Sequence, residues 1–185
     1  LDFITVVQKR NAFTKQQILV QIALAEKQMI KNGIVGVGDI CNTADTLYQK
    51  QQGHLQYYNF IEVFGVQDKK LNQIIVSAQD LRNQFRASGF KATISPHSPY
   101  SLTPKLVKEI ARNFDRKDEL VAIHMHESIQ EKELFENKQG AFFFWLKSIN
   151  ASSQIWEDRN KAIDILKEIE NKKVLLVHNT FAQIE

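Results

Sequence analysis

The sequence predicts an α/β protein with about five parallel strands that are joined by helical crossovers. Three observations lead to this fold class. Apolar, β-branched runs alternate with amphipathic segments along most of the chain. The connections between successive runs are roughly 15 to 45 residues long, which suits βα units and parallel pairing. Three of the predicted strands end in histidine, as is typical of sheets that carry reactive groups at the carboxyl ends of their strands.

The first helix is predicted to begin after Thr14, because Gln17 follows at capping-box spacing. Asn32-Gly33 supplies its end. Its apolar stripe consists of Ile18, Ile22, Ala25 and Met29. Before this helix, Leu1–Val7 fits either a short strand or a helical turn, because the segment is too short for periodicity to decide.

The remaining elements follow from the two periodicities of helices and strands. Strands are predicted at 34–40, 57–64, 90–95 and 173–178, and within 120–128 from Leu120 onward. Helices are predicted at 71–88 and 104–114, with helical segments at 130–137, 141–149 and 158–170, and a polar loop with a short helix at 42–52. The aromatic run Phe142–Trp145 is expected to pack against the next layer, since such residues usually lie in the core.

The composition limits the function classes. A chain of 185 residues with 43% hydrophobic and 24% charged residues fits one globular domain. A net charge of +3 without a Lys/Arg block argues against nucleic acid as a partner. The single cysteine, Cys41, excludes an internal disulfide and a cysteine-rich zinc site. No apolar run approaches the roughly 20 residues of a membrane span and no signal peptide is visible, so the expected partners exclude membranes and the expected location is cytoplasmic.

The segment Leu120–Ser128 carries the strongest signal for chemistry. It is an apolar run that ends in His124, His126 and Glu127, as in a parallel strand buried on both faces. On a strand the two histidines share one face, and Glu127 points the other way unless the chain has already turned into a loop. Imidazoles beside a carboxylate suit a divalent metal with a proton shuttle. The alternative is a strand end whose histidines are hydrogen-bonded to backbone carbonyls.

A second motif lies one predicted strand earlier. In Pro96-His-Ser-Pro-Tyr100, two prolines within four residues restrict the backbone on both sides of His97. A rigid turn at the end of a strand is therefore expected to present His97 at the same edge as His124 and His178.

Four segments together carry a family resemblance: Gly33–Asp39, Ser95–Tyr100, His124–Ser128 and Val174–His178. Their order is similar to that of the second, fourth, fifth and sixth strands of the metal-dependent amidohydrolase superfamily. The likeness is in particular to its deaminase and chlorohydrolase branch, which includes adenosine-homologue, guanine, cytosine and aminofutalosine deaminases. Pro-His-Ser-Pro-Tyr followed by His-x-x-Glu is the specific part of the likeness.

The resemblance implies a partial TIM (β/α)8 barrel, with residues 1–185 forming a single incomplete barrel domain that corresponds to strands two to six. The family's first-strand His-x-His pair and its eighth-strand Asp have no counterpart in this chain, and strands seven and eight are absent. His124-Met-His126 itself has the His-x-His form. However, Pro-His-Ser-Pro-Tyr precedes it and Glu127 follows it, so the order fits strands four, five and six.

For the whole protein the resemblance implies a metal-dependent hydrolase, most simply a deaminase of an amino-substituted heterocycle of the nucleoside or base type. One Zn2+ or Fe2+ is implied per intact site, with His124 as a ligand and weak or absent metal in this chain alone. Glu127 is the implied proton shuttle. His178 is implied either to orient the metal-activated water or to ligate a second metal. His97 and His126 are implied substrate contacts.

Two other interpretations stay open at this point: a catalytically inert fragment or relative, and a hydrolase of amide or chloro-substituted rings with the same site. Asp39 and Glu62 are expected to have surface or supporting roles. The expected partners are a small heterocyclic substrate and, because an open barrel exposes strand edges, a second copy of the chain in a homodimer.

Overall fold

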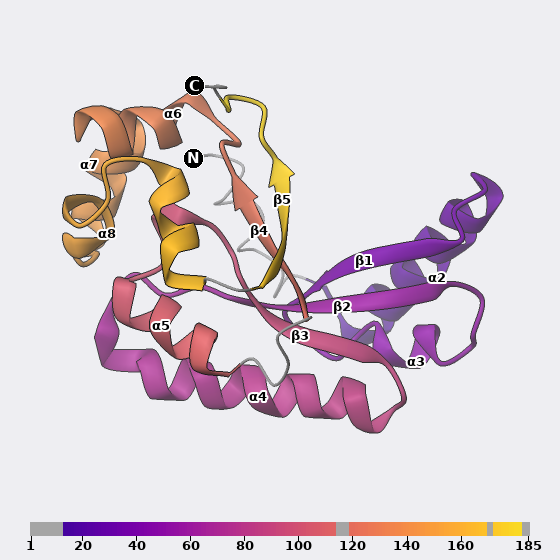
Figure 1. Cartoon of the computed structure of the whole chain (residues 1–185). Helices are drawn as coiled ribbons and strands as arrows, with labels where there is room; N and C mark the ends of the chain where they lie inside the picture. The colour runs from indigo at the N-terminus through magenta and orange to yellow at the C-terminus, as the bar shows by residue number, and fades with distance from the viewer. Residues whose placement is uncertain (1–12, 114–118, 170–171, 183–185) are drawn as a thin grey trace.

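The computed structural model describes residues 13–113, 119–169 and 172–182, so the prediction for Leu1–Val7 lies outside the described residues. Five parallel strands follow one another in the order of the chain (Figure 1). They are β1 (Gly36–Cys41), β2 (Gln56–Val63) and β3 (Lys91–Pro96) in a three-stranded sheet, and β4 (Leu120–Met125) and β5 (Lys173–His178) in a two-stranded sheet. The predicted α/β class with parallel strands and helical crossovers is confirmed.

The two sheets adjoin at β3 and β4. Hydrogen bonds cross this junction from Thr93 Oγ1 to the carbonyl of Leu120 at 2.8 Å and from the N–H of Ala122 to Ser95 Oγ at 3.3 Å. The carbonyl of His97 accepts the N–H of His124 at 2.8 Å and lies 3.1 Å from His124 Nδ1. Side-chain hydroxyls thus take the place of a regular backbone ladder over most of the junction. Figure 1 shows β4 and β5 turned steeply away from β1–β3, so the surface of the two sheets curves as it would in part of a barrel.

Helices cover one side of this curved surface. Figure 1 shows α4 (Leu71–Ala87) and α5 (Pro104–Arg112) lying side by side under the sheet. Thr103 caps α5, since its side chain accepts the N–H of Leu106 and Pro104 occupies the first helical position. The 3-10 helix η5 (Ala162–Ile169) packs beside α5. The apolar side chains of these helices and the outer faces of the strands form the core.

The first described helix, α2 (Lys15–Lys31), has the predicted capping box at Thr14, and Ile18, Ile22 and Met29 of its apolar stripe are half-buried. Ala25 is exposed, whereas Glu26 is the buried residue of this helix. Glu26 accepts a hydrogen bond from Tyr57 at 2.8 Å and lies 3.1 Å from His54 Nδ1. Figure 1 shows that α2 lies beyond the β1 edge, and these polar contacts help to hold it there.

Short helices make up the remaining connections. The helix α3 (Leu47–Lys50) lies between β1 and β2, and the 3-10 turns η2 (Asp68–Lys70) and η3 (Pro99–Ser101) precede α4 and α5. Four helices lie between β4 and η5: α6 (Ile129–Lys132), the π-helix η4 (Glu133–Asn137), α7 (Gly140–Ser148) and α8 (Gln154–Glu157). In α7 the aromatic run packs against the core through Phe142, Phe143 and Trp145, whereas Phe144 is 66% exposed. The core prediction is wrong for Phe144, because four consecutive helical side chains cannot face one side.

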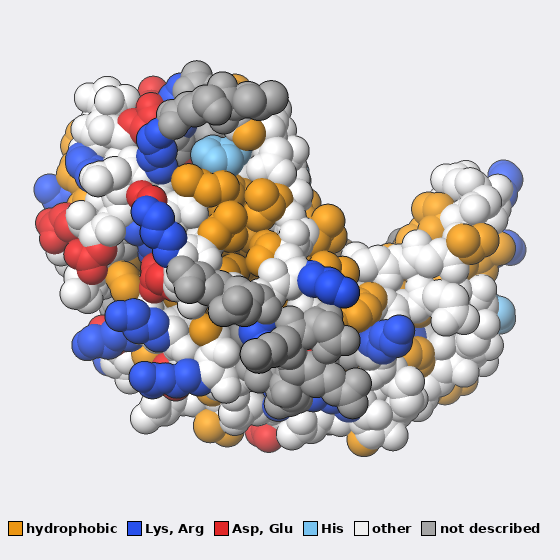
Figure 2. All heavy atoms as spheres, in the orientation of Figure 1, with side chains coloured by type: hydrophobic (Ala, Val, Ile, Leu, Met, Phe, Trp, Pro, Cys, Tyr) orange, Lys and Arg blue, Asp and Glu red, His pale blue; other side chains and the backbone are white. Residues whose placement is uncertain are grey.

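Some large apolar side chains stay on the surface. Leu175 in β5 and Ile163 in η5 are 47% and 40% exposed. Figure 2 shows hydrophobic side chains gathered on the face where η5, β4 and β5 lie. Within the described ranges, no helix has both the length and the apolarity that a membrane span requires.

Candidate active site

Three histidines form a row at the carboxyl ends of β3, β4 and β5. The ring centroids of His97 and His124 lie 5.3 Å apart, and those of His124 and His178 lie 5.2 Å apart. We call His97, His124 and His178 the histidine row. The sequence predicts that these side chains meet at one edge, and the structure brings them together there, because parallel strands end on the same side of a sheet.

The turn after β3 holds the His97 ring. Its Nδ1 lies 2.8 Å from Ser101 Oγ and 2.9 Å from Ser98 Oγ. Tyr100 packs edge-on against the ring, with centroids 5.8 Å apart. Burial lowers the pKa of His97, and the nearby His124 adds to this effect, against the opposing influence of Glu62. The ring is therefore fixed through Nδ1 and favours the neutral form, with Nε2 directed toward Glu62.

Glu62, near the end of β2, completes one side of the site. Its Oε1 lies 3.9 Å from His97 Nε2 and 3.8 Å from His124 Nδ1. Asn42 donates a hydrogen bond to Glu62 Oε2 at 3.0 Å. The sequence predicts only a surface or supporting role for Glu62, whereas the structure places its carboxylate beside two imidazoles. Its position at the end of a predicted strand was the available signal, because the same reasoning that groups the histidines applies to β2.

Asp39, the other carboxylate with an expected minor role, lies elsewhere. It pairs with the buried ammonium group of Lys50, which is also hydrogen-bonded to Asn59. Burial, followed by the charge of Asp39, raises the pKa of Cys41 in this cluster to about 12, so the thiol stays protonated. This cluster supports β1 and β2 and does not join the histidine row.

The strand β4 ends at Met125, and the next residue changes direction. His126 has a φ of 51°, in the left-handed region that residues other than glycine seldom adopt. The expectation that His124 and His126 share one strand face is therefore wrong. The charged groups that act on His126 are Glu136 and Lys132, in η4 and α6, and burial lowers its pKa.

The same turn brings Glu127 to the histidine row. Glu127 Oε1 lies 3.7 Å from His178 Nε2, and both side chains are partly exposed. The alternative in which the chain has already become a loop at Glu127 is the one found. His178 and Asn179 also have positive φ values, 74° and 53°, so unusual backbone conformations gather where β4 and β5 end. Such conformations are often concentrated at functional sites.

These side chains form two sets of groups, which adjoin where the His124 and His178 ring centroids lie 5.2 Å apart. On one side, the donor atoms of Glu62, His97 and His124 all lie within 4.8 Å of one another, which suits a single metal ion. On the other side, His178 and Glu127 provide an imidazole and a partly exposed carboxylate that could exchange protons with a bound molecule.

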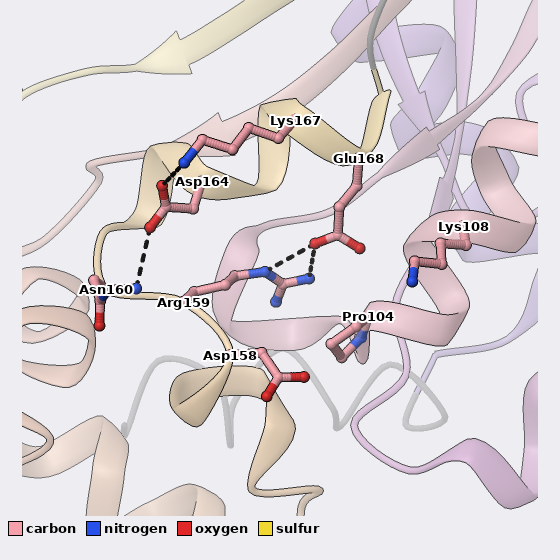
Figure 3. Close-up of a pocket in the computed structure, with 8 residues that line it drawn as sticks. All are labelled: Pro104, Lys108, Asp158, Arg159, Asn160, Asp164, Lys167 and Glu168. Carbon is pink, nitrogen blue, oxygen red and sulfur yellow. Dashed lines mark hydrogen bonds and ion pairs between the residues drawn. The ribbon is translucent and has the colours of Figure 1, made fainter.

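A separate pocket of about 380 Å³ lies between α5 and η5, and the histidine row does not line it. Figure 3 shows the Arg159 guanidinium in this pocket with Glu168 beside it. Arg159 is 2% exposed and donates to the carbonyls of Pro99 and Leu102 at 3.2 and 3.1 Å. Because Pro99 follows His97 by two residues, Arg159 ties the turn that carries His97 to η5. We therefore assign Arg159 a structural role.

Comparison with known proteins gives consistent matches. A model described as the Amidohydrolase family matches residues 6–181. The chain is 27% identical over 162 residues to an adenosine deaminase of Helicobacter pylori, covering 84% of this chain and 38% of that protein. It is 25% identical over 160 residues to an aminodeoxyfutalosine deaminase of Nitratiruptor sp., covering 85% of this chain and 39% of that protein.

A solved structure gives the same picture. The crystal structure of Helicobacter pylori aminofutalosine deaminase with methylthio-coformycin matches with a TM-score of 0.73 at 24% identity, covering 87% of this chain and 40% of that one. At this identity the likeness establishes the fold, and it confirms the predicted partial barrel. The chain thus spans about two fifths of the length of the proteins that it resembles.

Proposed function

Because the chain belongs to the amidohydrolase family, we propose that it forms part of a metal-dependent hydrolase that deaminates an amino-substituted heterocycle of the nucleoside or base type. The observation that carries the proposal is the histidine row with Glu127 beside His178. The deaminase names of the curated relatives support an adenosine-like substrate.

The residues present fit a divalent metal. Zinc and ferrous iron accept imidazole nitrogens and carboxylate oxygens, and the described site presents both within a few ångströms. We propose His124 as the ligand from β4, with His178 as a further ligand or an orienting group. When bound, the metal would supply a nucleophile at neutral pH by lowering the pKa of water toward 7.

Glu127 is the proposed proton carrier. In the reaction, the oxygen of water bonds to the ring carbon that bears the amino group, the carbon–nitrogen bond breaks, and ammonia leaves. Glu127 would accept one proton of the water and deliver it to the ring nitrogen. It would then carry the second proton of the same water from the added hydroxyl to the departing amine. A carboxylate that is partly exposed and held beside His178 can reach both partners. His178 would hold the attacking oxygen through hydrogen bonding.

His97 is the proposed substrate contact from β3. Its ring is fixed through Nδ1 by two serine hydroxyls, so Nε2 stays in one position to bind a ring substituent. His126 is a second proposed contact, on the side where η4 lies, because its charged neighbours belong to α6 and η4.

The proposal is tested by ammonia release from the whole protein. Adenosine, other amino-substituted nucleosides, and free guanine and cytosine are incubated with zinc-loaded or iron-loaded protein, with a His124→Ala variant in parallel. We expect ammonia from at least one compound with wild type and none with the variant. Release of chloride from a chloro-substituted ring, or of an amide product, would move the reaction to the chlorohydrolase or amidase class. No turnover of any compound would favour a non-catalytic relative.

A further inference from the structure

A buried carboxylate lies beneath the turn that carries Glu127. Glu131, in α6, is fully buried, and its Oε2 accepts the backbone N–H of Glu127 at 3.0 Å. The backbone N–H of His126 also bonds to this carboxylate. Among the described residues, the other oxygen, Oε1, has no hydrogen-bond partner. The Glu131 carboxylate therefore interacts with two consecutive backbone N–H groups of the turn.

The same turn is held from the opposite side by the end of β5. The N–H of Asn179 donates to the carbonyl of Met125 at 2.9 Å, and the N–H of Phe181 donates to the carbonyl of His126 at 3.0 Å. The left-handed conformation of His126 is unfavourable for a residue other than glycine. Hydrogen bonds on both sides offset that cost, so the turn depends on them.

The direction of Glu127 follows from this arrangement. Its N–H is directed inward to Glu131, while its carboxylate lies 3.7 Å from His178 Nε2 at the site. We propose that Glu131 is a positioning residue for proton transfer, holding the His126–Glu127 turn so that the Glu127 carboxylate faces His178. This inference rests on the proposed function, because it assigns Glu131 a task only if Glu127 carries protons.

The chemistry of the position supports this role. Burial raises the pKa of Glu131 to about 7, despite the two backbone N–H groups that oppose the shift. A carboxyl in such a place destabilises the fold near neutral pH, and an apolar side chain would avoid that cost. Proteins commonly keep an unfavourable polar group where a site needs it. Here Glu131 supplies the hydrogen-bond acceptor for the backbone N–H groups of His126 and Glu127.

The test compares substitutions at this position in the whole, metal-loaded protein. Glu131→Gln keeps an acceptor oxygen, and its amide can replace Oε1, which has no partner among the described residues. Glu131→Met keeps the length but removes the acceptor. For Glu131→Met we expect kcat to fall about 10²-fold with little change in KM, as for a small misplacement of a reacting group. Glu131→Gln should restore most of kcat.

Metal content, thermal midpoint and amide exchange accompany the kinetics. Hydrogen exchange at the backbone N–H of Glu127 should be faster in Glu131→Met but not in Glu131→Gln. This measurement does not require the protein to be active. Glu157→Met, at an exposed carboxylate on α8, is the control and should match wild type. If Glu131→Met fails to fold, Glu131→Asp takes its place, because the shorter side chain moves the carboxylate away from the turn by the length of one methylene group.

Wild-type kcat in a folded, metal-loaded Glu131→Met would overturn the inference, as would an equal loss of kcat in Glu131→Gln. For Glu131→Asp, wild-type kcat with unchanged Glu127 exchange would do the same. If wild type itself deaminates nothing, the proposed function fails, while the exchange measurement still reports whether Glu131 holds the turn.

Discussion

Glu127 Oε1 lies 3.7 Å from His178 Nε2, so residues from the ends of two neighbouring strands meet at the same point of the site. A carboxylate in this position can act on protons without being a metal ligand. Glu127→Gln keeps the shape and a hydrogen-bonding group but removes the base. In the whole protein we expect kcat to fall by about 10² to 10⁴ while metal content stays at the wild-type level.

Ammonia release and metal analysis on the same preparation check this expectation. Glu157→Gln serves as the matched control, since Glu157 is an exposed carboxylate on α8 and outside the histidine row. Loss of metal from Glu127→Gln, or near-normal turnover, would show that Glu127 is not the proton carrier.

The second prediction concerns metal binding by the chain itself. His124 belongs to the described donor cluster and also adjoins His178, so His124→Ala should weaken zinc binding at least about tenfold. His126→Ala is the control, because the His126 side chain interacts with the α6 and η4 segment. Zinc titration by calorimetry measures both. Wild-type zinc should be weak and removable by a chelator, and equal affinity in wild type and His124→Ala would contradict the ligand assignment.

The third prediction concerns stability and pH. The folded state raises the pKa of Glu131 to about 7 from the ordinary value of 4.5, chiefly through burial. Between those values the native state binds more protons than the unfolded state. The contribution of Glu131 to the free energy of unfolding is therefore fully present below pH 4.5 and is lost as pH rises through 7. At pH 8, Glu131→Gln should therefore be more stable than wild type by up to about 3 kcal/mol.

Urea unfolding of the chain at several pH values measures this difference, with Glu136→Gln as the control. The advantage of Glu131→Gln should shrink toward acid pH. A difference that stays constant with pH would show that the carboxyl of Glu131 is not responsible.

The fourth prediction concerns Arg159. Its Nε and Nη2 donate to Glu168 Oε1 at 3.2 and 2.8 Å, and Nη1 reaches two carbonyls. Arg159→Met leaves Glu168 and those carbonyls without their donor, so we expect a loss of about 3 to 5 kcal/mol in unfolding free energy. Lys167→Met removes an exposed cation from the same pocket and should change stability by less than about 1 kcal/mol. Similar small effects of both substitutions would contradict the structural role of Arg159.

The fifth prediction concerns association. Within the described residues, β1 pairs only with β2 and β5 only with β4, which leaves a free edge on each side. Leu175 is 47% exposed on β5. We expect the chain to self-associate as concentration rises, and Leu175→Lys to weaken that association. Light scattering after gel filtration measures both, and a wild-type monomer at all concentrations would contradict it.

Several features of this protein follow from the sequence alone. Alternating periodicities predict parallel strands in chain order, and parallel strands end at one edge, so the grouping of His97, His124 and His178 follows from their positions at strand ends. The capping box at Thr14 is equally local, since it depends only on residues three positions apart. Family membership follows from motifs of the same kind, which are short, contiguous and ordered along the chain.

Other features were decided by the tertiary structure. Whether Glu62 stays at the surface or faces two imidazoles depends on how β2 lies against β3 and β4. His126 leaves the strand face because the end of β5 and the carboxylate of Glu131 hold a left-handed turn there. In α2, Glu26 is buried in place of Ala25, because Tyr57 and His54 lie against its carboxylate. Periodicity records the conformation that each segment prefers by itself. These outcomes instead depend on hydrogen bonds and packing between segments that lie far apart in the chain and become neighbours only in the folded protein.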